Sequence, residues 1–187
     1  MSENTVNAAL DRFITRLKVL QPDLPLTVYD ADWPSVCCPE NSEEGSQVPW
    51  QPVRQTESQD MFERLGEALE TKIHPDLISY YSRYWSDPLP ARSSDGELSL
   101  LQVWNPEDLE RLRSNLIGHA MALQKQKRAL TFFFACTEPD GDYFLSIDNQ
   151  TGAVLVEQPG KKPLRTLANS LADYIDSLEP LPISDME

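Results

Sequence analysis

Apolar residues recur at helical spacing near the start of the chain. The steps between them are three or four residues, which places them on one face of an α-helix: Val6, Leu10, Phe13, Ile14, Leu17 and Leu20. Gln21-Pro22 follows directly, and proline cannot continue a helix. The pattern therefore predicts a helix over residues 6–20.

The periodicity is lost over residues 22–56, where six prolines interrupt the chain. We expect an irregular segment that Trp33 and Trp50 anchor to the rest of the protein. Residues 40–47 hold three glutamates and no large apolar side chain, so they are the expected mobile tip.

A second amphipathic helix is predicted over residues 58–73. Phe62, Leu65, Leu69 and Ile73 share one stripe, while acidic residues share another. Pro75 then begins a short third helix that extends to about residue 83.

The second half of the chain alternates between strand and helix patterns. We predict a strand over residues 98–103 and a helix over residues 105–127, capped by Asn105 and broken near Gly118. Strands over residues 131–137, 143–148 and 153–157 are joined by turn-forming sequences at 138–142 and 149–152, which predicts an antiparallel meander. The last helix carries its apolar face on Leu167, Leu171, Tyr174, Ile175 and Leu178.

These elements predict an α+β fold with a mainly antiparallel sheet and helices packed on one side, the other face remaining partly open. With 187 residues, of which 40% are hydrophobic, the chain fits a single domain over residues 1–187 better than two domains. Residues 182–187 are expected to form a disordered tail.

Charge narrows the choice of partner. Thirty acidic and 16 basic residues give a net charge of −14. Such a chain repels nucleic acid and anionic lipid alike, so neither a nucleic-acid partner nor a direct lipid anchor is expected. No apolar run approaches the roughly 20 residues that span a bilayer. A basic protein is the favoured partner.

We recognise no candidate catalytic residues in the sequence. His74 and His119 lie far apart without a ligand motif, so packing or hydrogen-bonding roles are expected for both. Three cysteines, Cys37, Cys38 and Cys136, are an odd number without zinc spacing, which suits a reducing compartment. The start of the chain lacks a secretory signal, so we expect a cytoplasmic, non-enzymatic protein without a metal or cofactor. An acidic metal-dependent hydrolase is the competing enzyme hypothesis.

Two acidic clusters are the candidates for partner binding. Like charges on the second predicted helix repel one another, and a basic partner would relieve that repulsion, although a solvated helix face is the simpler interpretation. Acids at the start of the helix near residue 106 also complement the helix dipole. The candidate residues are Asp60, Glu63, Glu67, Glu70, Glu107, Asp108 and Glu110.

Longer stretches of sequence resemble a known family. They are LLQVWNPEDL at residues 100–109, NLIGH at 115–119, WQP at 50–52, TFFFA at 131–135 and LANSLA at 167–172. In kind and order they are similar to the Syd family of bacterial SecY-interacting proteins, over almost the whole chain.

The resemblance implies a fold of the SUKH superfamily and a binding role without catalytic residues. It also implies a partner, the basic cytoplasmic loops of SecY, with a role in regulating or checking the Sec translocase. The protein is then expected to be a monomer, loosely associated with the cytoplasmic face of the inner membrane through SecY. Because the superfamily includes immunity proteins, sequestration of a toxin is the alternative.

Overall fold

The computed structural model describes residues 4–138 and 141–186, and the elements below are those of these residues. The helices are α1 (Val6–Leu20), α2 (Met61–Leu69), α3 (Pro75–Ser82), α4 (Pro106–Lys125) and α5 (Leu171–Ser177). The longer strands are β5 (Leu89–Ser93), β6 (Gly96–Leu100), β7 (Thr131–Thr137), β8 (Phe144–Asp148), β9 (Val154–Glu157) and β10 (Arg165–Ala168). The shorter ones are β1 (Leu26–Val28), β2 (Gln47–Pro49), β3 (Val53–Arg54), β4 (Tyr84–Trp85) and β11 (Glu179–Pro180).

Seven strands form one curled antiparallel sheet in the order β10-β9-β8-β7-β6-β5-β11. The pairs β5–β6, β7–β8 and β8–β9 are hairpins between consecutive strands, so the predicted meander is confirmed. Residues 139–140 of its first turn lie outside the described residues. Two smaller sheets pair β1 with β2 and β3 with β4.

Strand register assigns each side chain to a face of the sheet. Leu145 lies opposite Ala135, and Phe144 lies opposite Cys136, so Leu145 and Phe144 point to opposite faces. On the Leu145 face, Tyr80 of α3 and Tyr174 of α5 pack edge-on against Phe134. The predicted α+β class is confirmed. One refinement is that α4 reaches Phe144 from the other face through His119.

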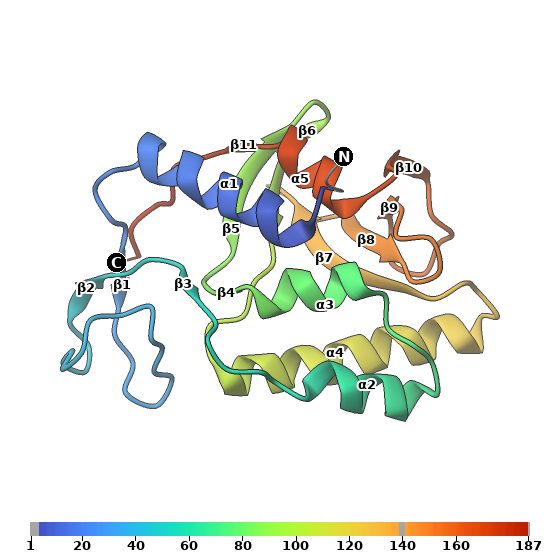
Figure 1. The fold of residues 1–187 in the computed structure, drawn as a ribbon, viewed down its shortest axis with the longest axis horizontal. Coiled ribbons are helices and arrows are strands. Elements are labelled where there is room, and N and C mark those ends of the chain that lie inside the picture. The colour runs from blue at the N-terminus through green and yellow to red at the C-terminus, as the bar shows by residue number, and fades with distance from the viewer. Residues whose placement is uncertain (1–3, 139–140, 187) are drawn as a thin grey trace.

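Helix α1 has the predicted bounds. Thr5 caps it by accepting the backbone N–H of Ala8, and its apolar stripe is buried from Val6 to Leu17, whereas Leu20 is exposed. Figure 1 shows α1 and α5 side by side above α3, with α2 and α4 along the lower edge. No helix among the described residues combines the length and apolar character that crossing a membrane requires.

Three predicted helix boundaries differ from the structure. Helix α2 ends at Leu69 because Glu70 has a left-handed backbone, with φ of 51°. Helix α4 runs unbroken through Gly118, so the predicted break is wrong. Leu167 belongs to β10 and not to the last helix, which begins only after Ser170 caps it by accepting the N–H of Asp173.

The segment 22–56 is less irregular than predicted, because it contains β1, β2 and β3. Trp50 is buried and packs edge-on against Trp104 at 5.5 Å, and Trp33 is partly buried against the core, so both act as anchors. The mobility expected of residues 40–47 stays a prediction.

The described part of the C-terminal tail contacts the rest of the protein, and the disorder expected of residues 182–187 stays a prediction. Within residues 182–186, Ile183 and the side chain of Gln21 exchange two hydrogen bonds. Leu26 donates its N–H to Asp185 and accepts the N–H of Met186. These contacts tie the described tail to the start of β1. Glu187 lies outside the described residues.

Candidate acidic binding site

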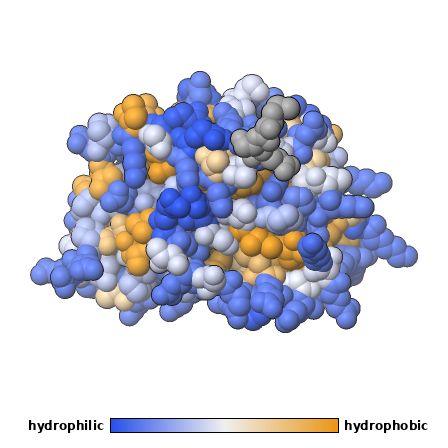
Figure 2. Space-filling model, in the orientation of Figure 1, coloured by the Kyte–Doolittle hydropathy of each residue, from blue (hydrophilic) through white to orange (hydrophobic). Residues whose placement is uncertain are grey.

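The seven acidic candidates lie on or beside two helices that pack against each other, α2 and α4. Figure 2 shows the lower edge of the molecule, where these helices lie, as mostly hydrophilic. The fold therefore brings the two clusters to one side of the protein, as a joint acidic face would require.

Arg64 already neutralises part of this acidity. It pairs with Asp60 one turn earlier and with Glu110 across the helix contact, and Arg113 binds Glu110 as well, at 3.1 Å. The hydrogen bonds from Arg64, followed by those from Arg113, lower the pKa of Glu110 to about 2. Glu110 thus joins α2 to α4, while Asp60 at the start of α2 pairs with Arg64 of the same helix.

Asp108 serves the start of α4. Its carboxylate accepts the backbone N–H of Trp104 at 2.8 Å, while the side chain of Asn105 accepts the N–H of Asp108 at 2.8 Å. This reciprocal cap satisfies N–H groups that a helix start leaves unpaired. The predicted N-cap at Asn105 is thus present, and Asp108 supports it from within the first turn of α4.

Four candidates on this side are exposed and have no ion pair to other described residues: Glu63, Glu67, Glu70 and Glu107. The predicted stripe over residues 60–70 is, however, not one helical face. Asp60 precedes the helix, and Glu70 leaves it with a left-handed backbone. Periodicity cannot detect such a change of backbone, so this correction needs the structure.

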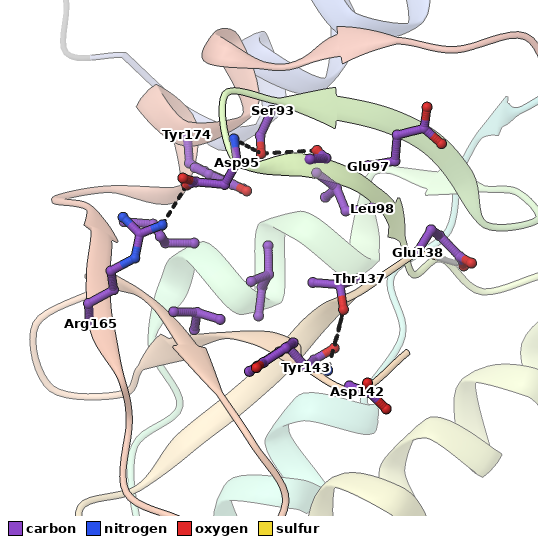
Figure 3. Close-up of a pocket in the computed structure, with 14 residues that line it drawn as sticks. Ser93, Asp95, Glu97, Leu98, Thr137, Glu138, Asp142, Tyr143, Arg165 and Tyr174 are labelled. Atoms are coloured by element: carbon purple, nitrogen blue, oxygen red, sulfur yellow. Dashed lines mark hydrogen bonds and ion pairs between the residues drawn. The ribbon is translucent and has the colours of Figure 1, made fainter. Parts of the chain in front are cut away.

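A second acidic site, which the sequence analysis missed, lies where the sheet curls. A groove of about 250 Å³ opens over β6, β8 and β9 beside α5. Its floor is apolar, formed by Leu98, Leu145 and Val156, and Tyr143 lines it with an exposed aromatic ring. Figure 3 shows Leu98 and Tyr143 among the polar side chains that line the groove. We call it the acidic groove.

Four acidic residues line the acidic groove together with one guanidinium, although the alternation of side chains along β6 directs Glu97 to the face opposite Leu98. Asp95 and Glu97 come from the β5–β6 hairpin, Glu138 and Asp142 from the connection between β7 and β8, and Arg165 from β10. The N–H of Glu138 donates to the carbonyl of Glu97 at 3.0 Å, so these two acids are neighbours. Arg92 pairs with Glu97 at 3.0 Å from outside the groove lining.

The groove's other polar groups are neutral. Burial, together with the nearby Asp95 carboxylate, raises the pKa of Tyr174, whose hydroxyl therefore keeps its proton at neutral pH. Thr137 accepts the N–H of Tyr143 and closes the hairpin. An acidic rim over an apolar floor is suited to bind a cationic, partly apolar peptide segment.

Both histidines have the structural roles expected of them. His74 caps α3 by accepting the N–H of Asp76 at 3.1 Å. His119 packs edge-on against Phe133 and Phe144, and burial lowers its pKa, so it is neutral at neutral pH. Within the described residues, no group of three or more His, Cys, Asp or Glu side chains is arranged to hold a metal.

Glu157 is a buried charge that the sequence did not single out. Its carboxylate is fully buried, accepts hydrogen bonds from Thr131 and Ser146, and pairs with Arg128 at 3.1 Å. Because these partners lie on neighbouring strands and just after α4, the network holds the end of α4 to the sheet. The nearest sequence signal is a glutamate at the end of an otherwise apolar strand.

Comparisons with known proteins agree with the resemblance described above. The family model described as Syd protein (SUKH-2) matches residues 3–180. A protein named Protein Syd from Pseudoalteromonas atlantica is 41% identical over 182 residues, covering 95% of this chain and 97% of that one. Protein Syd of Alteromonas mediterranea is 40% identical over 178 residues, with the same coverage. The chain therefore belongs to the Syd family.

Proposed function

We propose that this protein binds basic cytoplasmic loops of SecY in the acidic groove and thereby regulates or checks the Sec translocase. One observation carries the choice of site: an apolar groove is lined by four acidic residues, of which Glu138 and Asp142 have no ion pair to other described residues. Membership of the Syd family, from which the resemblance implies SecY as partner, supports the choice of partner.

Charge complementarity supports the same pairing. Cytoplasmic loops of membrane proteins carry an excess of Lys and Arg, and a net charge of −14 attracts them while anionic lipid repels it. The protein then associates with the cytoplasmic face of the inner membrane only through SecY. It acts by binding, without a catalytic step or a cofactor.

The exposed acids beside α2 and α4 are the alternative docking surface. Glu63, Glu67, Glu70 and Glu107 are free of ion pairs to other described residues, and they stay a prediction for partner contact. Asp60, Asp108 and Glu110 are weaker candidates because each already serves a contact within the protein.

An immunity function is the second candidate, favoured by the SUKH-2 label in the family description. A secreted toxin with a basic surface would use the same groove and need no cofactor. The two functions differ in where the partner is found, in the inner membrane or among soluble proteins.

A pull-down from detergent-solubilised inner membranes tests the proposal. SecY should be retained at about 0.1 M salt and largely lost at about 1 M, because the screening length falls from about 10 Å to about 3 Å. Vesicles of phosphatidylglycerol alone should retain nothing. Retention of SecY that does not depend on salt, or capture by protein-free vesicles, would contradict the electrostatic account. Recovery of a soluble basic toxin instead of SecY would favour the immunity function.

A further inference from the structure

An ion pair borders the acidic groove. Arg165, the first residue of β10, places Nη2 2.8 Å from Oδ2 of Asp95 in the turn between β5 and β6. Figure 3 shows this contact at one side of the groove, between β10 and the β5–β6 turn. Both side chains are more than half exposed, at 57% and 54%, so solvent and ligands can reach the pair.

The two residues belong to distant parts of the sheet. Strands β9, β8 and β7 lie between β10 and β6, and four steps of about 4.8 Å would separate these strands by about 19 Å in a flat sheet. The side chains meet because the sheet curls around the groove. The ion pair therefore closes the open side of the curl.

The same pair also borders a second cavity, of about 330 Å³, beside α5. The acidic groove and this second cavity have lining residues in common: Ser93, Asp95, Arg165, Leu167 and Tyr174. Asp173 adds a further carboxylate to the second cavity. The ion pair thus stands between two parts of what would otherwise be one longer acidic channel.

Asp95 is held in place without Arg165. Its backbone N–H donates to the Ser93 hydroxyl at 3.1 Å, and that hydroxyl donates to the carbonyl of Gly96 at 3.2 Å. An exposed ion pair adds little to folding, so a second cation can replace Arg165 at nearly equal energy. The Asp95 backbone is therefore fixed by the turn, and its exposed carboxylate stays within reach of another cationic side chain.

We infer that Arg165 occupies, in the free protein, the position beside Asp95 that a Lys or Arg side chain of the bound loop takes. The inference rests on the proposed binding of basic loops in the acidic groove. Arg165 then competes with the partner, and its release opens the channel toward Asp173. The contact sets how tightly the groove binds and favours partners whose basic residues are closely spaced.

The test compares Arg165→Gln with Lys162→Gln, which removes the same charge from an exposed position in the same β9–β10 connection. Binding is measured to SecY in nanodiscs and, separately, to a hexa-arginine peptide. Arg165→Gln should bind both about three- to tenfold more tightly, whereas Lys162→Gln should change affinity by less than about twofold. Thermal melts of both variants should match the unmodified protein.

A double-mutant cycle with Asp95→Asn makes the test specific. The gain from Arg165→Gln should vanish when Asp95→Asn is also present, because no carboxylate is then released. Equal gains from Arg165→Gln and Lys162→Gln, a gain that persists in the Asp95→Asn background, or weaker binding by Arg165→Gln would each overturn the inference. If no form binds SecY while the peptide results hold, the proposed function fails and the competing role of Arg165 stands.

Discussion

The acidic groove and the face formed by α2 and α4 carry similar charge but use it differently. On the helices, Arg64 pairs with Asp60 and Glu110, and Asp108 caps α4, so these acids stabilise the fold. In the groove, Glu138 and Asp142 have no ion pair to other described residues and stand beside an apolar floor. Net charge alone cannot distinguish these two regions.

This difference indicates which carboxylates can contribute to partner binding. A carboxylate that already pairs with a neighbour must lose that contact before it gains another, so little net energy results. A carboxylate at the edge of a concave apolar surface adds attraction to burial of the ligand's apolar atoms. The groove meets both conditions, and the helix face meets the first only at its free glutamates.

The largest expected effect is on binding. Changing Glu97, Glu138 and Asp142 together to Gln, Gln and Asn should weaken binding to SecY nanodiscs about 10- to 30-fold. Most of the loss should come from Glu138 and Asp142, because Glu97 already pairs with Arg92. The matched helix variant, Glu63→Gln with Glu67→Gln and Glu70→Gln, should stay within about threefold of the unmodified protein. Titration followed by fluorescence anisotropy, with both variants at one salt concentration, provides the measurement.

The outcome separates three interpretations. A loss confined to the groove variant would support the acidic groove as the site. Equal losses in both triple variants would mean that only net charge matters. A loss confined to the helix variant would transfer the site to α2 and remove the acidic groove from the account.

The second prediction concerns stability. Glu110→Gln should lower Tm by about 1–3 °C, because it removes the carboxylate that joins Arg64 and Arg113 across α2 and α4. Glu138→Gln, its control in the groove, should leave Tm unchanged. Differential scanning calorimetry decides the matter, and a Tm loss for Glu138→Gln as large as that for Glu110→Gln would show that the groove acid is also structural.

The third prediction is the pH dependence of that difference. The folded-state pKa of Glu110 is about 2, below its ordinary value near 4.5, so its contribution to stability is present above pH 4.5 and is lost as pH falls toward 2. The Tm gap between the unmodified protein and Glu110→Gln should therefore close across this range. A gap that stays constant down to pH 2 would contradict the role of the Arg64 contact.

The smallest expected effect is the change in thermal stability of the helix triple variant. Glu63 and Glu67 lie one turn apart and repel each other, whereas Glu70 is outside the helix. Removing the three charges should raise Tm by about 1 °C. A clear decrease in Tm would contradict this prediction, because it would mean that these glutamates stabilise the fold.

Periodicity predicted those parts of the fold in which local pattern and packing agree. Helix α1 and strand β7 have the predicted bounds because α1 buries its apolar stripe from Val6 to Leu17 and β7 buries most of its apolar run. Strand β5 was not predicted because Pro88 and Pro90 interrupt its pattern, although Pro90 occupies a sheet position opposite Ser99. Without β5, the hairpin that carries Asp95 and Glu97 cannot be recognised in the sequence.

The acidic groove could not be predicted for the same reason. Asp95 and Glu138 are more than 40 positions apart in the sequence, and only the antiparallel pairing of β6 with β7 brings their turns to one end of the sheet. The acids of α2 were easier to find because they are close in sequence. They are recognised by their helical spacing, but this spacing does not indicate whether they line a concave surface that could bind a partner.

Site-specific photo-crosslinking tests the central claim most directly. A benzoylphenylalanine in place of Tyr143, which is 37% exposed in the acidic groove, reports contact there, and the same probe in place of exposed Ala68 reports contact at α2. With SecY-containing membranes, the account predicts a SecY adduct from position 143 and none from position 68. An adduct from position 68 alone would contradict it.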